Sequence, residues 1–138
     1  MTRRLTARQA AALGLAPKRS KYHAVPTAYA GVRYASKAEA ARAEWLDAEK
    51  AAGRVLWWIG QPTFRLGCAE NVYRPDFLVA WCGSPTNRMF CSIRAEDVKG
   101  KRTAKLNRDV RLWRAYAPLP LWVIERGKLV EIVDPKEG

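Results

Sequence analysis

The sequence has few of the residues that hold soft metals or close a disulfide framework. His23 is the only histidine, and Cys68, Cys82 and Cys91 are not spaced as C-x-x-C. A zinc finger or a histidine-based metal site is therefore not expected, and any metal would be held by oxygen ligands. Because the number of cysteines is odd, we expect no closed disulfide framework but reduced thiols, packed as small apolar side chains in a cytoplasmic protein.

Long apolar runs are also missing. No stretch approaches the ~20 residues that a transmembrane helix needs, so no membrane association is expected. The basic start at residues 1–4 is not followed by an apolar segment, and no secretory signal is expected. The 138 residues, of which 49% are hydrophobic, fit one globular domain without repeats or low-complexity segments.

Acidic residues are scarce, and none precedes Glu39. The 25 Lys and Arg residues outnumber the 13 Asp and Glu residues, which gives a net charge of +12. This excess favours a polyanionic partner, nucleic acid above all, although a solvated basic surface is the alternative. We expect residues 1–22 to be a basic arm with a short helix over 6–12, ahead of a single domain over 23–138. The arm either wraps nucleic acid or is a disordered leader, and its expected DNA-binding residues are Arg3, Arg4, Lys18, Arg19 and Lys21.

Two helices are predicted from capping signals and 3.6-residue periodicity. Ser36 and Glu39 have the spacing of a capping box and open the first helix, which ends near Gly53. Thr103 caps the second helix, which ends at Tyr116 before two prolines. The buried stripes are expected at Ala41, Trp45, Ala48 and Ala52 in the first helix, and at Leu106, Val110, Trp113 and Ala117 in the second.

Apolar runs between turn signals predict the strands. They are expected over residues 55–59, 63–66, 72–81, 89–99, 121–125 and 128–133, the last two forming a hairpin. The run 89–99 is apolar enough to be a central strand. The neighbouring Trp57 and Trp58 would face opposite sides of their strand, so one of them would lie outside the main core, in a dimer interface for example. The order predicts an α/β or α+β domain with a central mixed sheet flanked by helices.

Acidic residues occur on two of the predicted strands, near the end of one and after Pro75 in the other. Asp97 and Lys99 share one face of their strand, and Asp76 lies on a strand that can pair with it. Two carboxylates brought together repel each other unless a cation lies between them, and Mg²⁺ accepts such oxygen ligands together with water and phosphate. The alternatives are an ion pair of Asp76 with Arg74 or Arg33, and a surface ion pair between Asp97 and Lys99.

These residues resemble a known motif. Pro75-Asp76 followed by Asp97-Val98-Lys99 is similar to the PD-(D/E)xK motif of the restriction-endonuclease-like nuclease superfamily, although glutamate is commoner than aspartate at the position of Asp97. The helix-borne Glu39 resembles the glutamate of Holliday junction resolvases in that superfamily. Residues 99–103, which run into a basic helix, resemble a phage and prophage subgroup related to RecU-type resolvases. The resemblance covers residues 21–133 and implies a restriction-endonuclease-like core.

The resemblance implies a role for each residue. The implied ligands of Mg²⁺, for which Mn²⁺ can substitute, are Asp76, Asp97, Glu39 and the backbone carbonyl of Val98. Lys99 would orient the attacking water or stabilise the phosphate, and Gln61 would support the site. Glu39 has a second interpretation as the capping partner of Ser36, and the two roles are compatible.

The second helix carries basic side chains outside its apolar stripe. They would bind the phosphates beside the cut, or else form a solvated face; with the preceding turn they are Lys101, Arg102, Lys105, Arg108 and Arg111. We therefore expect a Mg²⁺-dependent endonuclease that hydrolyses phosphodiester bonds of branched DNA as a homodimer, without an organic cofactor. The resemblance implies a phage- or prophage-encoded protein that acts in the host cytoplasm. The alternatives are a non-catalytic DNA-binding protein, a sequence-specific or nicking nuclease, and a transposase-type nuclease.

Overall fold

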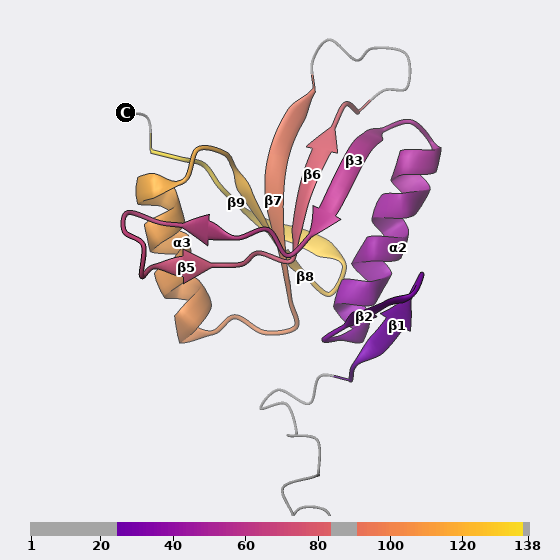
Figure 1. Cartoon of the computed structure of the whole chain (residues 1–138), viewed down its shortest axis with the longest axis horizontal. Helices are drawn as coiled ribbons and strands as arrows, with labels where there is room; N and C mark the ends of the chain where they lie inside the picture. Colours follow the sequence, from indigo (N-terminus) through magenta and orange to yellow (C-terminus); the bar gives the residue numbers. More distant parts are fainter. Residues whose placement is uncertain (1–24, 84–90, 137–138) are drawn as a thin grey trace, which may run out of the picture.

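The computed structural model describes residues 25–83 and 91–136 as an α+β fold around a five-stranded sheet (Figure 1). The strand order is β3-β6-β7-β8-β9, with β7 parallel to β8 and the other pairs antiparallel. The strands are β3 (Val55–Gly60), β6 (Phe77–Trp81), β7 (Ser92–Lys99), β8 (Leu121–Glu125) and β9 (Lys128–Val133). The predicted mixed sheet is confirmed, with β7 at its centre.

Two helices, α2 (Lys37–Ala51) and α3 (Ala104–Tyr116), cover opposite faces of the sheet (Figure 1). Both predicted N-caps are present: Ser36 Oγ accepts a hydrogen bond from the Glu39 amide at 3.2 Å, and Thr103 Oγ1 accepts one from the Leu106 amide at 3.1 Å. The predicted stripe of α3 is buried throughout. The helix is therefore held against the sheet by the face that its sequence pattern indicates.

The predicted buried stripe of α2 is wrong, because the buried residues lie on nearly the opposite face of the helix. The buried residues are Ala40, Ala43 and Leu46, whereas the predicted set Ala41, Trp45, Ala48 and Ala52 is exposed. The rotation brings two polar side chains to partners on the sheet and on the first hairpin. Arg42 forms a bidentate ion pair with Glu96, and Asp47 accepts hydrogen bonds from Trp58 Nε1 at 2.8 Å and from the Tyr29 hydroxyl at 2.7 Å.

Two short hairpins lie outside the main sheet. β1 (Thr27–Tyr29) and β2 (Val32–Tyr34) are joined by an Ala30-Gly31 turn, in which both residues have positive φ. β4 (Phe64–Arg65) pairs with β5 (Val72–Tyr73). The single strand predicted over 72–81 is therefore wrong: it is split into β5 and β6. Pro75 lies at the break, where a residue without a backbone N–H cannot continue a ladder.

The core has two parts, one on each face of the sheet. α3 and the β4–β5 hairpin enclose the first around Trp113, Tyr73 and Leu121. α2 encloses the second around Phe77, Leu46 and Val79. The predicted division of the tryptophan pair is confirmed, because Trp58 packs edge-on against Phe77 at 5.6 Å while Trp57 is 38% exposed.

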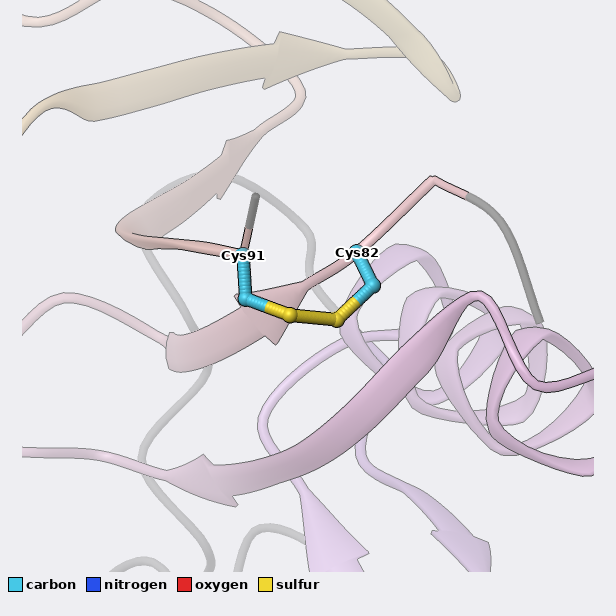
Figure 2. Close-up of a disulfide and its surroundings, with 2 residues drawn as sticks. All are labelled: Cys82 and Cys91. Atoms are coloured by element: carbon cyan, nitrogen blue, oxygen red, sulfur yellow. A yellow bond between two sulfur atoms is a disulfide. The ribbon is translucent and has the colours of Figure 1, made fainter. Parts of the chain in front are cut away.

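The prediction of reduced, packed cysteines is wrong. Cys82 and Cys91 form a disulfide at the end of the β6–β7 pair, where the register Trp81↔Ser92 places them opposite each other (Figure 2). Cys68 is a free thiol, and it is exposed rather than packed in the core.

Several predictions concern residues outside the described ranges. They include the basic arm over 1–22 with its helix over 6–12, the start of the strand predicted over 89–99, and the residues Arg3, Arg4, Lys18, Arg19 and Lys21. Within the described ranges, neither helix is long and apolar enough to cross a membrane.

Candidate active site

The pairing of β6 with β7 brings the two motif acids to the same edge of the sheet. Phe77 is opposite Glu96, so in this antiparallel register the preceding Asp76 lies beside Asp97. Asp76 Oδ2 accepts a hydrogen bond from the Val98 amide at 2.7 Å, which ties the end of β6 to β7. The contact that Val98 makes here is through its amide, and the metal-binding role of its carbonyl stays a prediction.

Asp97 is 1% exposed and has two close partners. Its Oδ1 lies 3.1 Å from Lys99 Nζ, and its Oδ2 accepts a hydrogen bond from the hydroxyl of Tyr73. Among the described residues, Oδ1 receives no hydrogen bond of good geometry. A buried carboxylate oxygen in this state has unused capacity to accept a hydrogen bond or bind a cation.

Glu39 belongs to the same electrostatic group, although it lies on the first turn of α2. The pKa of its carboxyl lies above the usual range, mainly because the side chain is buried and to a smaller extent because of Asp97. Lys99 and hydrogen bonds from Ala35 and Ser36 act in the opposite direction. The capping and site interpretations of Glu39 are thus compatible: one end of α2 supplies both the cap and a carboxylate near Lys99.

Burial and the neighbouring charges change the pKa values of Asp76 and Lys99. Burial, Asp97 and Glu39 together raise the pKa of Asp76 to about 8. Burial lowers the pKa of Lys99, but Asp97 and Asp76 outweigh this effect and hold it above its usual range. Lys99 is therefore an ammonium ion at neutral pH, and several acidic side chains share its charge.

A groove of about 440 Å³ opens beside this group, between β5, β7 and α3. Its lining residues are Val72, Tyr73, Arg74, Asp97, Lys99, Thr103, Lys105, Leu106 and Asp109. Two functional candidates were not predicted, namely Tyr73 and Asp109. Asp109 is 5% exposed, and burial raises the pKa of its carboxyl. Asp109 could have been identified from the sequence, because it is an acid next to the apolar stripe of α3. The sequence around Tyr73 gave no such signal.

The oxygen ligands of this group fit an open cation site rather than a closed cage. The described residues contain no group of three or more His, Cys, Asp or Glu side chains arranged to hold a metal. Mg²⁺ commonly binds through one or two carboxylates and completes its shell with water and phosphate, so a closed cage is not required. The hard oxygen ligands, their mutual repulsion and the Oδ1 of Asp97, which has an ion pair with Lys99 but no hydrogen bond from the described residues, fit such an ion.

Gln61 contributes backbone rather than side-chain support. Its amide donates a hydrogen bond to the Asp76 carbonyl at 2.8 Å, and its φ of 50° turns the chain sharply at the end of β3. Its side chain is exposed. The structure thus places Gln61 next to the acids, and it places Glu39, Asp76, Asp97 and Lys99 together.

The predicted DNA-binding residues lie on both sides of α3. Lys105 lines the active-site groove, together with Arg74, which was not predicted. A second groove of about 450 Å³ on the other side of α3 is lined in part by Arg102, Arg111 and Arg114. Arg102 also pairs with Glu131, Arg108 donates to Asn71 at 3.2 Å, and Lys101 is exposed.

Comparison of the chain with protein-family models, with curated proteins and with solved structures found no match. The resemblance to PD-(D/E)xK nucleases therefore depends on the residues themselves. These are Pro75-Asp76, Asp97-Val98-Lys99 and the upstream Glu39, which the fold brings to one end of the sheet.

Proposed function

We propose that the chain is a Mg²⁺-dependent DNA endonuclease of the PD-(D/E)xK type, with a restriction-endonuclease-like core. One observation carries the proposal: Asp76, Asp97 and Glu39 share an electrostatic environment with the ammonium ion of Lys99, beside an open groove. Carboxylates crowded in this way are costly for folding, and perturbed groups of this kind in a cleft are typical of functional sites.

The acidic residues would hold the ion. Asp76 and Asp97 would bind it directly, Glu39 directly or through water, and the carbonyl of Val98 would complete the protein ligands. When bound, Mg²⁺ would lower the pKa of its water and offset the charge that develops on the phosphate. Asp76 is anchored by the Val98 amide, so its carboxylate is held at the edge of β7.

Lys99 would act as a fixed positive charge. Its pKa lies above the usual range, so it keeps its protons at neutral pH and is a poor general base. Asp97 holds its ammonium group at 3.1 Å, at the wall of the groove. From there it would donate hydrogen bonds to the scissile phosphate or orient the attacking water.

The basic side chains on both sides of α3 support DNA as the substrate. Lys105 and Arg74 line the first groove and Arg111 the second, so the phosphates beside the cut would meet positive charge on both sides of the helix. Contacts of this type recognise backbone and shape rather than sequence. We extend the proposal to branched DNA, Holliday junctions first, and to a cytoplasmic homodimer that places two sites on one junction.

The test is a cleavage assay with labelled four-way junction, flap and linear duplex, in Mg²⁺ or EDTA. We expect Mg²⁺-dependent cleavage that Asp97→Ala and Lys99→Ala abolish while both variants still bind DNA. Lys128→Ala, which removes an exposed lysine on β9 outside the site, is the matched control and should cleave normally. Absence of cleavage of every substrate in Mg²⁺ and in Mn²⁺ would refute the proposal, and binding without cleavage would indicate a DNA-binding protein.

A further inference from the structure

Tyr73 connects the β4–β5 hairpin to the acid at the centre of the site. Its hydroxyl donates a hydrogen bond to Asp97 Oδ2, and both residues are buried, at 6% and 1% exposure. The two residues are 24 positions apart and come from different sheets. The hydrogen bond engages Oδ2 and leaves Oδ1 beside Lys99, without a hydrogen bond from the described residues.

The phenol ring of Tyr73 is held firmly by its surroundings. It packs edge-on against Trp113 of α3 at 5.8 Å, and Phe64 packs against the same indole at 4.8 Å. The turn of the hairpin lies against the end of α3, since a Cβ built at Gly67 would lie 2.7 Å from the Tyr116 ring. The hydroxyl therefore reaches Asp97 from a ring that is packed against the core and the end of α3.

We propose that Tyr73 is a positioning residue that fixes the rotamer of Asp97, so that Oδ1 stays next to Lys99 and available to a divalent cation. The inference rests on the proposed function, because it assigns Tyr73 a role in the metal affinity of that site. Groups that hydrogen-bond a metal-ligating carboxylate orient it, and their loss typically weakens metal binding about 10- to 100-fold. A tyrosine that only filled the core would have no such effect.

The experiment measures metal binding directly, in addition to cleavage. Mn²⁺ binding to the full chain without DNA is followed by calorimetry or electron paramagnetic resonance, and cleavage is measured against Mg²⁺ concentration. Tyr73→Phe keeps the ring against Trp113 and removes only the hydroxyl. Tyr29→Phe is a matched control, because it removes another tyrosine hydroxyl that donates to an aspartate, Asp47, at 2.7 Å outside the site.

We expect Tyr73→Phe to weaken Mn²⁺ binding and to raise the Mg²⁺ midpoint of cleavage about 10- to 100-fold, with a rate at saturating metal near that of the wild type. Tyr29→Phe should leave both unchanged. Tyr73→4-aminophenylalanine keeps a donor on the ring and should restore binding to within about threefold, which also tests the role of the donor if Tyr73→Phe does not fold.

The possible failures can be distinguished. If the wild type binds Mn²⁺ and cleaves DNA but Tyr73→Phe has the same metal dependence, the inference is wrong and the proposed function stands. The inference is also wrong if the 4-aminophenylalanine variant binds as weakly as Tyr73→Phe, or if Tyr29→Phe has an equal effect. A wild type that neither binds Mn²⁺ nor cleaves DNA would overturn both.

Discussion

Replacing Asp76 by asparagine separates the charge of this side chain from its hydrogen bond, because the amide oxygen can still accept from the Val98 amide. Burial, Asp97 and Glu39 raise the pKa of Asp76 to about 8 in the folded chain, whereas an unfolded aspartate titrates near ~3.9. Between these two values the folded state binds more protons than the unfolded state. In the absence of divalent cations, the stability of the wild type should therefore fall as the pH rises through this window.

The size of the effect follows from the same shift. Stability should fall by about 1.4 kcal/mol for each pH unit, and by about 5 kcal/mol in total between about pH 4 and pH 8. This is a large fraction of the ~5–15 kcal/mol that stabilises an ordinary domain. The asparagine side chain of the variant does not titrate. The stabilities of wild type and Asp76→Asn should therefore be similar near about pH 4, and the variant should be the more stable near about pH 8.

The measurement is urea unfolding of both chains in EDTA at several pH values. The difference between the two curves cancels the titration of every group that the substitution leaves alone. Asp134→Asn, which removes an exposed carboxylate near the end of the chain, controls for net charge. A difference between wild type and Asp76→Asn that does not change with pH would show that Asp76 is not held in a repulsive cluster, and the argument for a cation site would lose its basis.

Two further predictions concern the scaffold of the site. Glu96 is fully buried between Arg42 and Arg94, so Glu96→Gln should leave buried arginine charge uncompensated. We expect the substitution to lower the free energy of unfolding by about 3–5 kcal/mol, measured by urea unfolding. A loss below about 1 kcal/mol would contradict this prediction. The Cys82–Cys91 disulfide joins residues nine positions apart, and replacing both cysteines by serine should lower the free energy of unfolding by about 2–3 kcal/mol. The double variant should have a lower melting temperature than the wild type, and dithiothreitol should not change it further.

Local signals were sufficient for the parts of the fold that are decided locally. The bounds of β8 and β9 agree with prediction because two apolar runs flank the Arg126-Gly127 turn, whose positive φ values form a tight hairpin. The apolar stripe of α3 was predictable because leucine, valine and tryptophan contrast with the basic residues between them. The buried face of α2 was not, since alanines occur on all of its faces. Arg42 and Asp47, through partners on distant strands, select the face that is buried.

The acids of the site could be predicted because Asp76 and Asp97 lie on strands that were expected to pair, but their supporting contacts could not. Tyr73 was placed on the same predicted strand as Asp76, and only the break at Pro75 sends it into a separate hairpin that returns to Asp97. The disulfide depends on register in the same way. The odd cysteine count argued against it, whereas the pairing of β6 with β7 sets Cys82 opposite Cys91.

Two neighbouring acids on β7 differ in how their charge is compensated. Glu96 is buried and receives hydrogen bonds from two arginines, and the guanidinium of Arg94 stacks on Trp122 at 3.5 Å. Asp97 is equally buried but has one lysine and one hydroxyl as partners among the described residues, next to a second carboxylate. A buried acid that served only stability would be expected to resemble Glu96, because uncompensated buried charge is costly. The incomplete hydrogen bonding of Asp97 is thus specific to the face of β7 that borders the groove, where we propose that a divalent cation binds.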